Sequence, residues 1–592
     1  MTNELQIPEP HKQMIAAQWP DRALNPEQKK YLEGFFAGMQ AQGISFAGAV
    51  TTASVEDSAP LIFEERVKRE EHPLDSYYRL TDNAAFNKAP DKEETFRFKW
   101  NGLFYLTPVK DAFMARLRIP GGQLRTFQLR EIAQVAKQLT TGYVQITTRA
   151  NFQIRLIQPK DAPEVLRRIQ SVGLHTRGAG ADNIRNITAN PTAGVDPHEL
   201  VDVTPYCNDL AQFILAHREF YDLPRKFNIA LDGGGLIGSI EDTNDIGVRA
   251  VRVNENSMGI APGIYFRMKL GGATGHKAFA RDLGVLISPD QVVKVILAAV
   301  RVFIANGNRT DRKKARLKHL LDTWTLDQYL VEMEKLLAAS LIRAPLDADG
   351  KSFLHESEMA STVAHSHIGA FPQKQTGYHY IGVAMPVGQI SPDQLLRLAD
   401  LADNYGSGEV RLTVWQNLVL PHIPEAYVET VKKALVKMGF HWKQSNLSSG
   451  VVACTGNAYC KYAATNTKAH ALEIIKKLEK RITLDQPINI HVTGCPHSCA
   501  QHYMGDIGLL GAKVNRAGES IEGYHVFVGG GFAASRSIGR QVFQGIPFDE
   551  VIDLLEKMLK AYLRHRTSGE TFQQFTARHD LNALQTLFCQ DV

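Results

Sequence analysis

The stretches RIPGGQL, residues 118–124, and AMPVGQI, residues 384–390, are two versions of one motif. Each has a Pro, a Gly and a Gln at the same places, and the two copies lie 266 positions apart. The same offset aligns, without a gap, ITTRANFQI (146–154) with LTVWQNLVL (412–420), and the glycine of SVGL (171–174) with that of KMGF (437–440). Chance does not keep one register over so long a stretch. The sequence therefore predicts two homologous halves that make up most of the chain.

Within a half, the pattern predicts the order strand, helix, strand, helix. In the second half GYHYIGVAMP (377–386) alternates like a strand, and Ser391-Pro392-Asp393 then supplies an N-cap and a first-turn proline for a helix. EVRLTVW (409–415) follows as a strand, and a helix over 425–439 ends at a glycine stop signal.

Each half continues into a larger α/β region. YFRMKLGGA (265–273) resembles YHVFVGGGF (524–532), so Gly-rich strand ends recur in both regions. Residues 1 to about 105 lie outside the duplication and are expected to form a helical leader and a wrapping arm, and the charged stretch 311–354 is expected to be a helical link. The predicted fold class is α/β (α+β), internally duplicated.

Four of the six cysteines fall in two close pairs, each in a Gly-containing turn: Cys454 and Cys460 in CTGNAYC, and Cys495 and Cys499 in GCPHSC. Four thiolates suit either a zinc ion or an iron–sulfur cluster. Zinc knuckles usually have two to four residues between paired cysteines, so the gaps of five and three residues favour the larger, cluster-sized object. Cys207 and Cys589 stand alone, and we expect no special role for them.

Composition indicates a globular protein with several domains: 592 residues, 44% hydrophobic and 22% charged. The start, MTNELQIPEPHKQ, has acidic residues and no apolar run, which argues against a secretory signal. The longest apolar stretch, residues 292–305, is interrupted by Lys294 and Arg301 and predicts a buried helix, because it is too short to span a bilayer. Few, clustered cysteines fit a reducing compartment, so a cytoplasmic location is expected. The formal net charge of +5 is too small to imply nucleic-acid binding.

The first half lacks the paired thiols and has cations instead, at turns or predicted strand ends. These are Arg118, Arg149, Arg185, Arg225 and Lys226. Guanidinium groups bind carboxylates and oxyanions bidentately, so such a set suits a polycarboxylate cofactor and an anionic substrate. Because the cations lie in the first half and the paired cysteines in the second, we expect one central site to which both halves contribute.

The chain resembles the siroheme-dependent nitrite and sulfite reductase family over nearly everything beyond residue 105. The motifs that carry the resemblance are CTGNAYC, TGCPHSCAQ, RLRIPGGQ, TTRANFQIR, DNIRN, LPRKFN and NGNRTDRKKAR, in a duplicated chain. By this resemblance the domains are an arm (1–105), ferredoxin-like half-domains (106–176 and 356–442), a siroheme- and substrate-binding α/β domain (177–355), and a cluster- and siroheme-binding α/β domain (443–592).

The resemblance implies a [4Fe–4S] cluster held by Cys454, Cys460, Cys495 and Cys499, with Cys499 also bridging to the iron of a siroheme. It further implies that four residues bind the substrate anion and deliver protons: Arg118, Arg185, Lys226 and Asn228. Other residues resemble positions that hold the macrocycle's carboxylates: Thr147, Arg149, Gln153, Arg225 and Lys313. Lys313 sits in a basic run, which equally fits a solvated helix face.

Departures from the family pattern bear on the substrate. Lys226-Phe227-Asn228 stands where sulfite reductases commonly have Lys-Phe-Lys, and Gln145 stands where some have an Arg. Both changes weaken the attraction for a doubly charged anion and resemble ferredoxin-dependent nitrite reductases. The stretch GAGADNIRN has no cysteine that could crosslink to a tyrosine, as some members do, and His497 replaces a usual Asn.

These features predict an assimilatory enzyme that reduces nitrite to ammonium in a six-electron reaction, with sulfite reduction to sulfide as the alternative. GAGADN at Gly178 lacks the third glycine of a dinucleotide fingerprint, so a separate donor is expected: by resemblance a ferredoxin, or another small electron carrier. No nucleic acid or membrane is an expected partner, and a monomeric state is left open. Two other classes remain: a zinc-stabilised nucleic-acid-binding protein, which would need aromatic platforms or a higher pI, and a pure electron-transfer iron–sulfur protein, which would not need the arginine set.

Overall fold

The structure is a computed structural model that describes residues 61–105, 112–140, 142–254, 259–345, 367–443 and 445–590. Most of the expected helical leader, residues 1–60, lies outside the described residues. The described part of the arm has the helices α3 (Phe63–Glu70), α4 (Tyr77–Ala85) and α5 (Lys92–Arg97). Asp91 caps α5, because its side chain accepts the backbone N–H of Glu94. The indole of Trp100 donates to the carbonyl of Tyr221 at 2.7 Å, which ties the arm to the first half.

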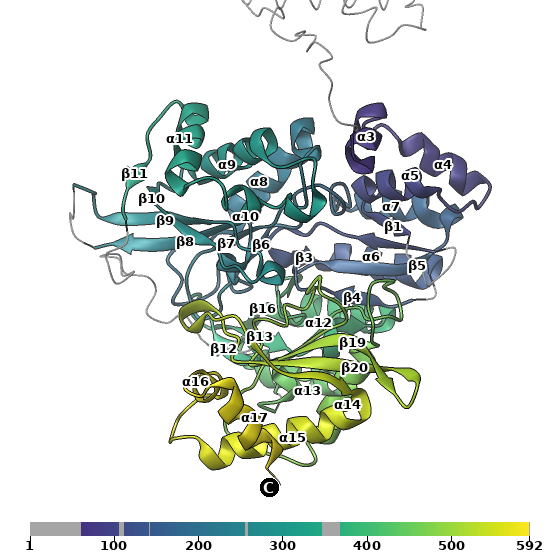
Figure 1. The fold of residues 1–592 in the computed structure, drawn as a ribbon. Helices are drawn as coiled ribbons and strands as arrows, with labels where there is room; N and C mark the ends of the chain where they lie inside the picture. The colour runs from purple at the N-terminus through teal and green to yellow at the C-terminus, as the bar shows by residue number, and fades with distance from the viewer. Residues whose placement is uncertain are drawn as a thin grey trace, which may run out of the picture. The chain divides into compact units, whose positions relative to one another are not determined.

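Two small antiparallel sheets form the beginnings of the two halves (Figure 1). The first sheet has the order β1 (Leu103–Tyr105), β2 (Phe113–Arg116), β5 (Phe152–Ile157), β4 (Val144–Ile146) and β14 (Gln389–Ile390). The second has the order β12 (Gly369–Pro372), β13 (Tyr378–Val383), β16 (Leu418–Pro424), β15 (Glu409–Leu412) and β3 (Gln123–Arg125). The helices that follow these strands are α6 (Thr126–Leu139) and α7 (Ala162–Ser171) in the first half, and α12 (Pro392–Tyr405) and α13 (Val428–Lys437) in the second.

The halves exchange one strand each: β3 of the first half ends the second sheet, and β14 of the second half ends the first. Both exchanged strands begin at the glutamine of the matched motifs, directly after Gly122 with φ +75° and Gly388 with φ +67°. A Cβ on Gly122 would lie 2.5 Å from the carbonyl oxygen of Leu412, and one on Gly388 would lie 2.7 Å from that of Ile146. Glycine is therefore required twice, by the left-handed backbone and by the close approach of the other half.

Other matched positions also share their geometry. The Thr147 amide donates to the Asn151 carbonyl at 3.0 Å, and the Thr413 amide donates to the Asn417 carbonyl at 2.9 Å. One hydrophobic core includes side chains of both small sheets. Helix α6 of the first half contacts α12 of the second half, where the Thr126 hydroxyl donates to the Asp403 carboxylate at 2.6 Å. The internal duplication predicted from the sequence is confirmed. The predicted strand 409–415 is shorter than expected and ends at Leu412, because Gln416 with φ +62° belongs to a turn.

The two larger sheets also share one topology. The first has the order β6 (Thr188–Ala189), β7 (Ile229–Asp232), β8 (Ile246–Val253), β9 (Gly263–Leu270), β10 (Arg281–Ile287) and β11 (Ile342–Arg343). The second has β17 (Val451–Ala453), β18 (Ile490–Thr493), β19 (Ile507–Arg516), β20 (Glu519–Val528) and β21 (Arg540–Pro547). In both, the first three strands are parallel and the next two are antiparallel.

Helices cover each larger sheet (Figure 1). Those of the first half are α8 (Thr204–Ala216), α9 (Val292–Asn306), α10 (Leu317–Leu320) and α11 (Leu326–Leu337). Those of the second half are α14 (Thr467–Leu478), α15 (Phe548–His565), α16 (Phe572–Ala577) and α17 (Leu581–Cys589). The apolar stretch 292–305 forms α9, which is buried in the core as predicted. Within the described residues, we find no helix with the length and apolar character that a membrane span requires.

Candidate active site

Parallel strands bring two of the paired cysteines to one sheet edge. Cys454 directly follows β17, and Cys495 comes two residues after β18, its parallel neighbour. The carboxyl ends of parallel strands meet at the same edge, and here the Cys454 amide donates to the carbonyl of Val492 at 3.0 Å. The amide of Gly494 in turn donates to Cys454 Sγ at 3.2 Å. A backbone N–H from the neighbouring strand end therefore points at the Cys454 sulfur.

Tight turns deliver the other two cysteines. The Cys460 amide donates to the Gly456 carbonyl at 3.0 Å, and Gly456 has φ +73° with no space for a Cβ, which would lie 2.7 Å from the Thr467 nitrogen. Cys499 lies in the turn that follows Cys495, and Thr148 of the first half donates its hydroxyl to the Cys499 carbonyl at 3.0 Å. The turn that carries Cys499 is therefore anchored to the other half.

The four thiols lie close enough to affect one another electrostatically. Burial, and then the neighbouring Cys499, Cys454 and Cys460, raise the pKa of Cys495 to about 12. Among the described residues, no three His, Cys, Asp or Glu side chains converge on a point that would hold a single metal ion. Four thiols from the ends of two parallel strands and the turns after them provide the four-thiolate set that a zinc ion or an iron–sulfur cluster requires.

Buried cations surround this cysteine set, and sequence reasoning missed them. Arg155 on β5 is 3% exposed and donates to Thr455 Oγ1 and to Gln145 Oε1, both at 2.7 Å. Burial lowers its pKa to about 10. Lys468 on α14 donates to the carbonyl of Ala453, the residue before Cys454, at 3.4 Å, and burial lowers its pKa to about 7. Buried cations beside the thiols offset the negative charge that a thiolate-bound cluster brings.

Of three first-half cations predicted from the sequence, Arg118 and Arg185 are held by backbone carbonyls, and Lys226 interacts electrostatically with Cys499. The Arg118 guanidinium donates to the carbonyls of Arg177 and Arg185, at 3.2 and 3.3 Å. Arg185 donates to the carbonyl of Ala181 at 2.8 Å, and burial lowers its pKa well below the usual value. Burial, and then Arg316, lower the pKa of Lys226 to about 7, whereas the Cys499 sulfur raises it. Cations of one half thus face a cysteine of the other.

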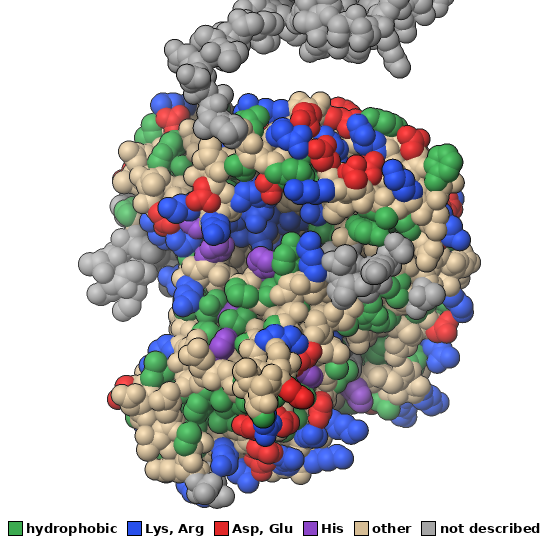
Figure 2. All heavy atoms as spheres, turned by 45° about the vertical axis from the view of Figure 1, so that its right-hand side comes forward, with side chains coloured by type: hydrophobic (Ala, Val, Ile, Leu, Met, Phe, Trp, Pro, Cys, Tyr) green, Lys and Arg blue, Asp and Glu red, His purple; other side chains and the backbone are tan. Residues whose placement is uncertain are grey.

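One further cation of this group was not predicted. Arg116, the last residue of β2, donates to the Ala179 carbonyl at 3.3 Å. Burial lowers the pKa of Arg116, and the nearby Cys499 sulfur partly offsets this effect. Its only sequence signal was its place two residues before Arg118. On the face drawn in Figure 2, Lys and Arg side chains gather in a hollow of the surface.

The predicted cofactor-binding residues divide into groups. Arg149 is held by the protein itself, because it donates to the carbonyls of Asn186 at 2.6 Å and Ile229 at 3.1 Å, and Thr147 accepts the Arg149 amide at 3.0 Å. Gln153 accepts a hydrogen bond from Arg155 at 2.6 Å. Thr147 and Arg149 lie in the turn between β4 and β5, and Gln153 lies on β5 beside the buried Arg155.

Arg225 and Lys313 differ in their surroundings. The Arg225 guanidinium lies 3.7 Å from the buried carboxylate of Asp182. The Lys313 side chain is exposed and only its amide contacts Asp311, at 2.9 Å, whereas the guanidinium of the preceding Arg312 contacts Asp182. In this basic run the structure thus connects Arg312, rather than Lys313, with the buried groups.

Asn228 and His497 flank the site. Asn228 directly precedes β7 and donates its amide to Asp245 Oδ2 at 2.8 Å. His497 is exposed, with Nδ1 3.5 Å from Cys495 Sγ and its ring edge-on to Tyr462 at 5.1 Å. The unusual His497 therefore contacts a predicted cluster ligand directly.

Comparisons with known proteins agree with this arrangement. A family model described as the nitrite and sulphite reductase 4Fe-4S domain matches residues 180–341 and 445–588, and one for the nitrite/sulfite reductase ferredoxin-like half domain matches 107–172 and 371–438. The ferredoxin–nitrite reductase of Synechococcus elongatus is 36% identical over 471 residues, which cover 78% of this chain and 88% of that protein. The chloroplastic ferredoxin–nitrite reductase of Spinacia oleracea is 32% identical over 514 residues, 84% of each chain.

A solved structure is similar throughout. The Mycobacterium tuberculosis NirA protein superposes with a TM-score of 0.80 at 28% identity and covers 89% of this chain and 98% of its own. Both family models match each half once, as the duplicated fold requires. The chain therefore belongs to the nitrite and sulphite reductase family, whose members carry siroheme and a [4Fe–4S] cluster.

Proposed function

We propose that this chain reduces nitrite to ammonium with electrons from ferredoxin, at the place where the first-half cations meet Cys499. The electrostatic coupling of Lys226 and Arg116 to Cys499 carries the proposal, because it joins an anion-binding residue set to the predicted cluster ligands. The relatives named ferredoxin–nitrite reductase support the substrate and the donor. The reaction takes up six electrons and eight protons and releases ammonium and two waters.

The residues present fit both cofactors. Cys454, Cys460, Cys495 and Cys499 would hold the cluster, with Cys499 shared with the siroheme. The siroheme carboxylates would be met by Arg149, Arg225, Thr147 and Gln153. Lys313 stays in this set on resemblance alone. When bound, the cofactors supply a metal position for the anion and a store of electrons.

The chain's own cations bind and orient the anion. Arg118 and Arg185 are held rigidly by backbone carbonyls, so little side-chain freedom is lost when an anion binds. Burial removes competing water, which strengthens each charge-assisted hydrogen bond. These two guanidinium groups therefore position the substrate, because their planar forks suit a small oxyanion.

Lys226 is the group best suited to donate protons. With a pKa lowered to about 7, its ammonium is partly deprotonated at neutral pH and can release and regain a proton. Asn228, two residues later, contributes a neutral amide where a lysine would add a second cation. This suits the singly charged nitrite better than the doubly charged sulfite.

The net charge of the chain and the state of its cysteines support the proposed donor and the proposed compartment. A formal net charge of +5 favours the approach of a small acidic electron carrier. All six cysteines lie in the part of the chain that the structure describes, and all are free thiols. Free thiols fit the cytoplasmic location that we propose.

Steady-state assays with nitrite and sulfite, under anaerobic conditions and with ammonium and sulfide measured, test the proposal. We expect a higher kcat/KM for nitrite. Asn228→Lys should move the ratio toward sulfite by about 10- to 150-fold, since one charge-assisted hydrogen bond contributes about 1.5–3 kcal/mol. Asn582→Lys, on the exposed surface of α17, adds the same charge elsewhere and should leave the ratio unchanged. A wild-type preference for sulfite would contradict the proposal and favour sulfite reduction.

A further inference from the structure

Three arginines of the segment 309–316 each hold a carboxylate from a different loop. The pairs are Arg309 with Asp222, Arg312 with Asp182, and Arg316 with Asp245. The sequence of this segment, RTDRKKAR, suggested a solvated basic run. In the structure, the three arginines form ion pairs while the intervening Lys313 and Lys314 are exposed.

Two of these pairs are bidentate, and in both the carboxylate is buried. Arg312 donates to both carboxylate oxygens of Asp182, at 2.7 and 2.8 Å. Arg316 donates to both oxygens of Asp245, at 3.1 and 2.7 Å. The side chains of Asp182 and Asp245 are both 0% exposed. A buried ion pair adds little net stability, but it fixes orientation, and loss of one partner leaves an uncompensated charge.

Both carboxylates continue to residues of the proposed site. Asp245 Oδ2 accepts the amide of Asn228 at 2.8 Å. Asp182 lies 3.7 Å from the guanidinium of Arg225 and only three residues before Arg185. Arg316 and Arg312 are therefore each connected to a residue of the proposed site by one shared carboxylate.

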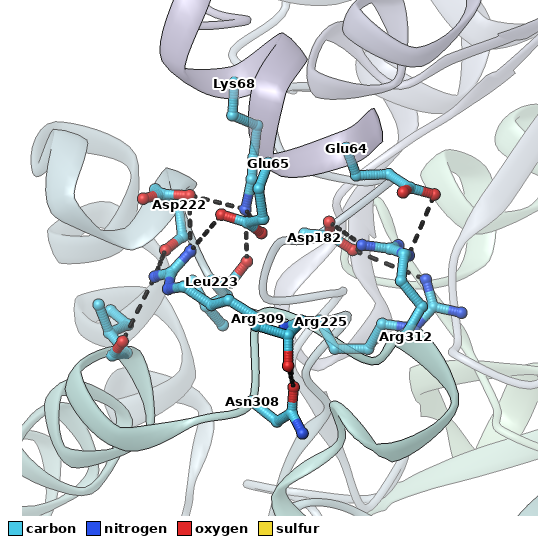
Figure 3. Close-up of polar contacts among 12 residues, drawn as sticks. Glu64, Glu65, Lys68, Asp182, Asp222, Leu223, Arg225, Asn308, Arg309 and Arg312 are labelled. Carbon is cyan, nitrogen blue, oxygen red and sulfur yellow. Dashed lines mark hydrogen bonds and ion pairs between the residues drawn. The ribbon is translucent and has the colours of Figure 1, made fainter. Parts of the chain in front are cut away.

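Helix α3 of the arm supports the same segment from outside (Figure 3). Glu64 lies 3.2 Å from Arg312, and Glu65 lies 3.2 Å from Arg309. Lys68 donates to the carbonyl of Leu223 at 3.1 Å and pairs with Asp222 at 2.8 Å. The arm thus contacts both the arginine segment and the loop that leads to Arg225 and Lys226.

The second half lacks this arrangement at the matching place. Asp506 accepts the amide of Asn489 at 2.8 Å, just as Asp245 accepts that of Asn228. Its carboxyl is not paired with an arginine among the described residues, and burial raises its pKa to about 7. The arginine pairing is therefore specific to the half that carries the proposed anion site.

We propose that Arg316 and Arg312 are positioning residues, which act through Asp245 and Asp182 to set Asn228 at the anion site and Arg225 among the residues that would hold the cofactor carboxylates. The inference rests on the proposed function for the identity of the anion. The contacts of Arg312 and Arg316 with the two carboxylates are independent of that function. The segment 309–316 acts as a brace on the loops that end in β6, β7 and β8.

The test compares Arg316→Gln and Arg312→Gln with Lys314→Gln, which removes an exposed cation from the same segment. Hydrogen exchange of the full chain reports on two amides directly: Asn228, which donates to Asp245, and Arg185, which donates to the Phe227 carbonyl at 2.7 Å. We expect Arg316→Gln to speed exchange at Asn228, Arg312→Gln to speed exchange at Arg185, and Lys314→Gln to change neither. If Arg316→Gln does not fold, Arg316→Lys is used instead, because it keeps the charge and loses the bidentate guanidinium. We expect Arg316→Lys to speed exchange at the Asn228 amide by a smaller factor.

Kinetics per bound siroheme give the second readout. Arg316→Gln should raise KM for nitrite by about tenfold or more with a smaller change in kcat, as for outer-shell partners of other sites. Unchanged exchange and unchanged KM in both arginine variants would overturn the inference even when the wild type reduces nitrite. Faster exchange in the arginine variants of a protein that does not reduce nitrite would support the brace and overturn the proposed function instead.

Discussion

Lys226 gives the sharpest prediction, since its protonation state should govern the pH dependence of nitrite reduction. Lysine in water has a pKa of about 10.4, whereas burial and the neighbouring Arg316 lower that of Lys226 to about 7. The charged form is therefore lost as the pH rises through about 7. We expect kcat/KM for nitrite to be constant well below pH 7 and to fall by about tenfold per pH unit well above it.

Two substitutions separate charge from proton donation. Lys226→Gln removes the charge-assisted hydrogen bond, which contributes about 1.5–3 kcal/mol, so kcat/KM at pH 6 should fall by about 10- to 150-fold. The decline of kcat/KM above pH 7 should disappear. Lys226→Arg keeps a cation at every pH in the range and should also lose the decline.

Initial rates from pH 5.5 to 9, with a small artificial reductant and with siroheme content measured for each variant, provide the assay. The reductant avoids any effect of pH on the encounter with ferredoxin. The reasoning fails if Lys226→Gln retains the wild-type decline above pH 7, because another group would then be responsible for it.

Three further outcomes are expected. Cys499→Ser should abolish the electronic coupling between cluster and siroheme and multi-electron reduction, whereas Cys589→Ser, at the exposed end of α17, should have no effect; a coupled spectrum with normal turnover in Cys499→Ser would exclude the bridging role. Raised salt should slow turnover with ferredoxin far more than with a small reductant, because only the protein encounter is steered over a Debye length, and equal sensitivity with both donors would contradict this. Gly388→Ala should lower the free energy of unfolding by about 1–3 kcal/mol or more in urea titrations, because of its positive φ and the Ile146 carbonyl 2.7 Å from the added Cβ, while Gly518→Ala, which shares the positive φ but has open space, should cost less.

The duplicated fold could be predicted from sequence because backbone geometry requires particular residues. Gly122 and Gly388 are matched since each adopts a left-handed conformation against the other half, where a Cβ has no space. The exchange of β3 and β14 between sheets could not be predicted. Both strands are short, and nothing in their residues specifies which half supplies the neighbouring strand.

The cysteine set could also be predicted, since close pairs of cysteines in Gly-containing turns are rare and chemically specific. The buried cations were harder. Arg155 sits inside a strand and Lys468 inside a helix, where a lone cation usually lies on the solvated face. The structure shows that Arg155 contacts Thr455 of the other half, and that Lys468 donates to the carbonyls of Val387 and Ala453.

The basic run illustrates the same limit. Sequence similarity drew attention to Lys313, whereas the structure places Arg312 and Arg316 against buried carboxylates. Their partners, Asp182 and Asp245, are far away along the chain and belong to loops without a pairing signal. The role of Lys313 in holding the cofactor remains a prediction.

The central claim is that both halves build one site that holds a siroheme beside a [4Fe–4S] cluster. Quantifying iron, acid-labile sulfide and siroheme in the same anaerobically purified sample tests it most directly. We predict that iron exceeds sulfide by the amount of siroheme, and that Cys454→Ser lowers sulfide and iron together. Zinc in place of iron, or iron equal to sulfide with no siroheme bands, would contradict the claim.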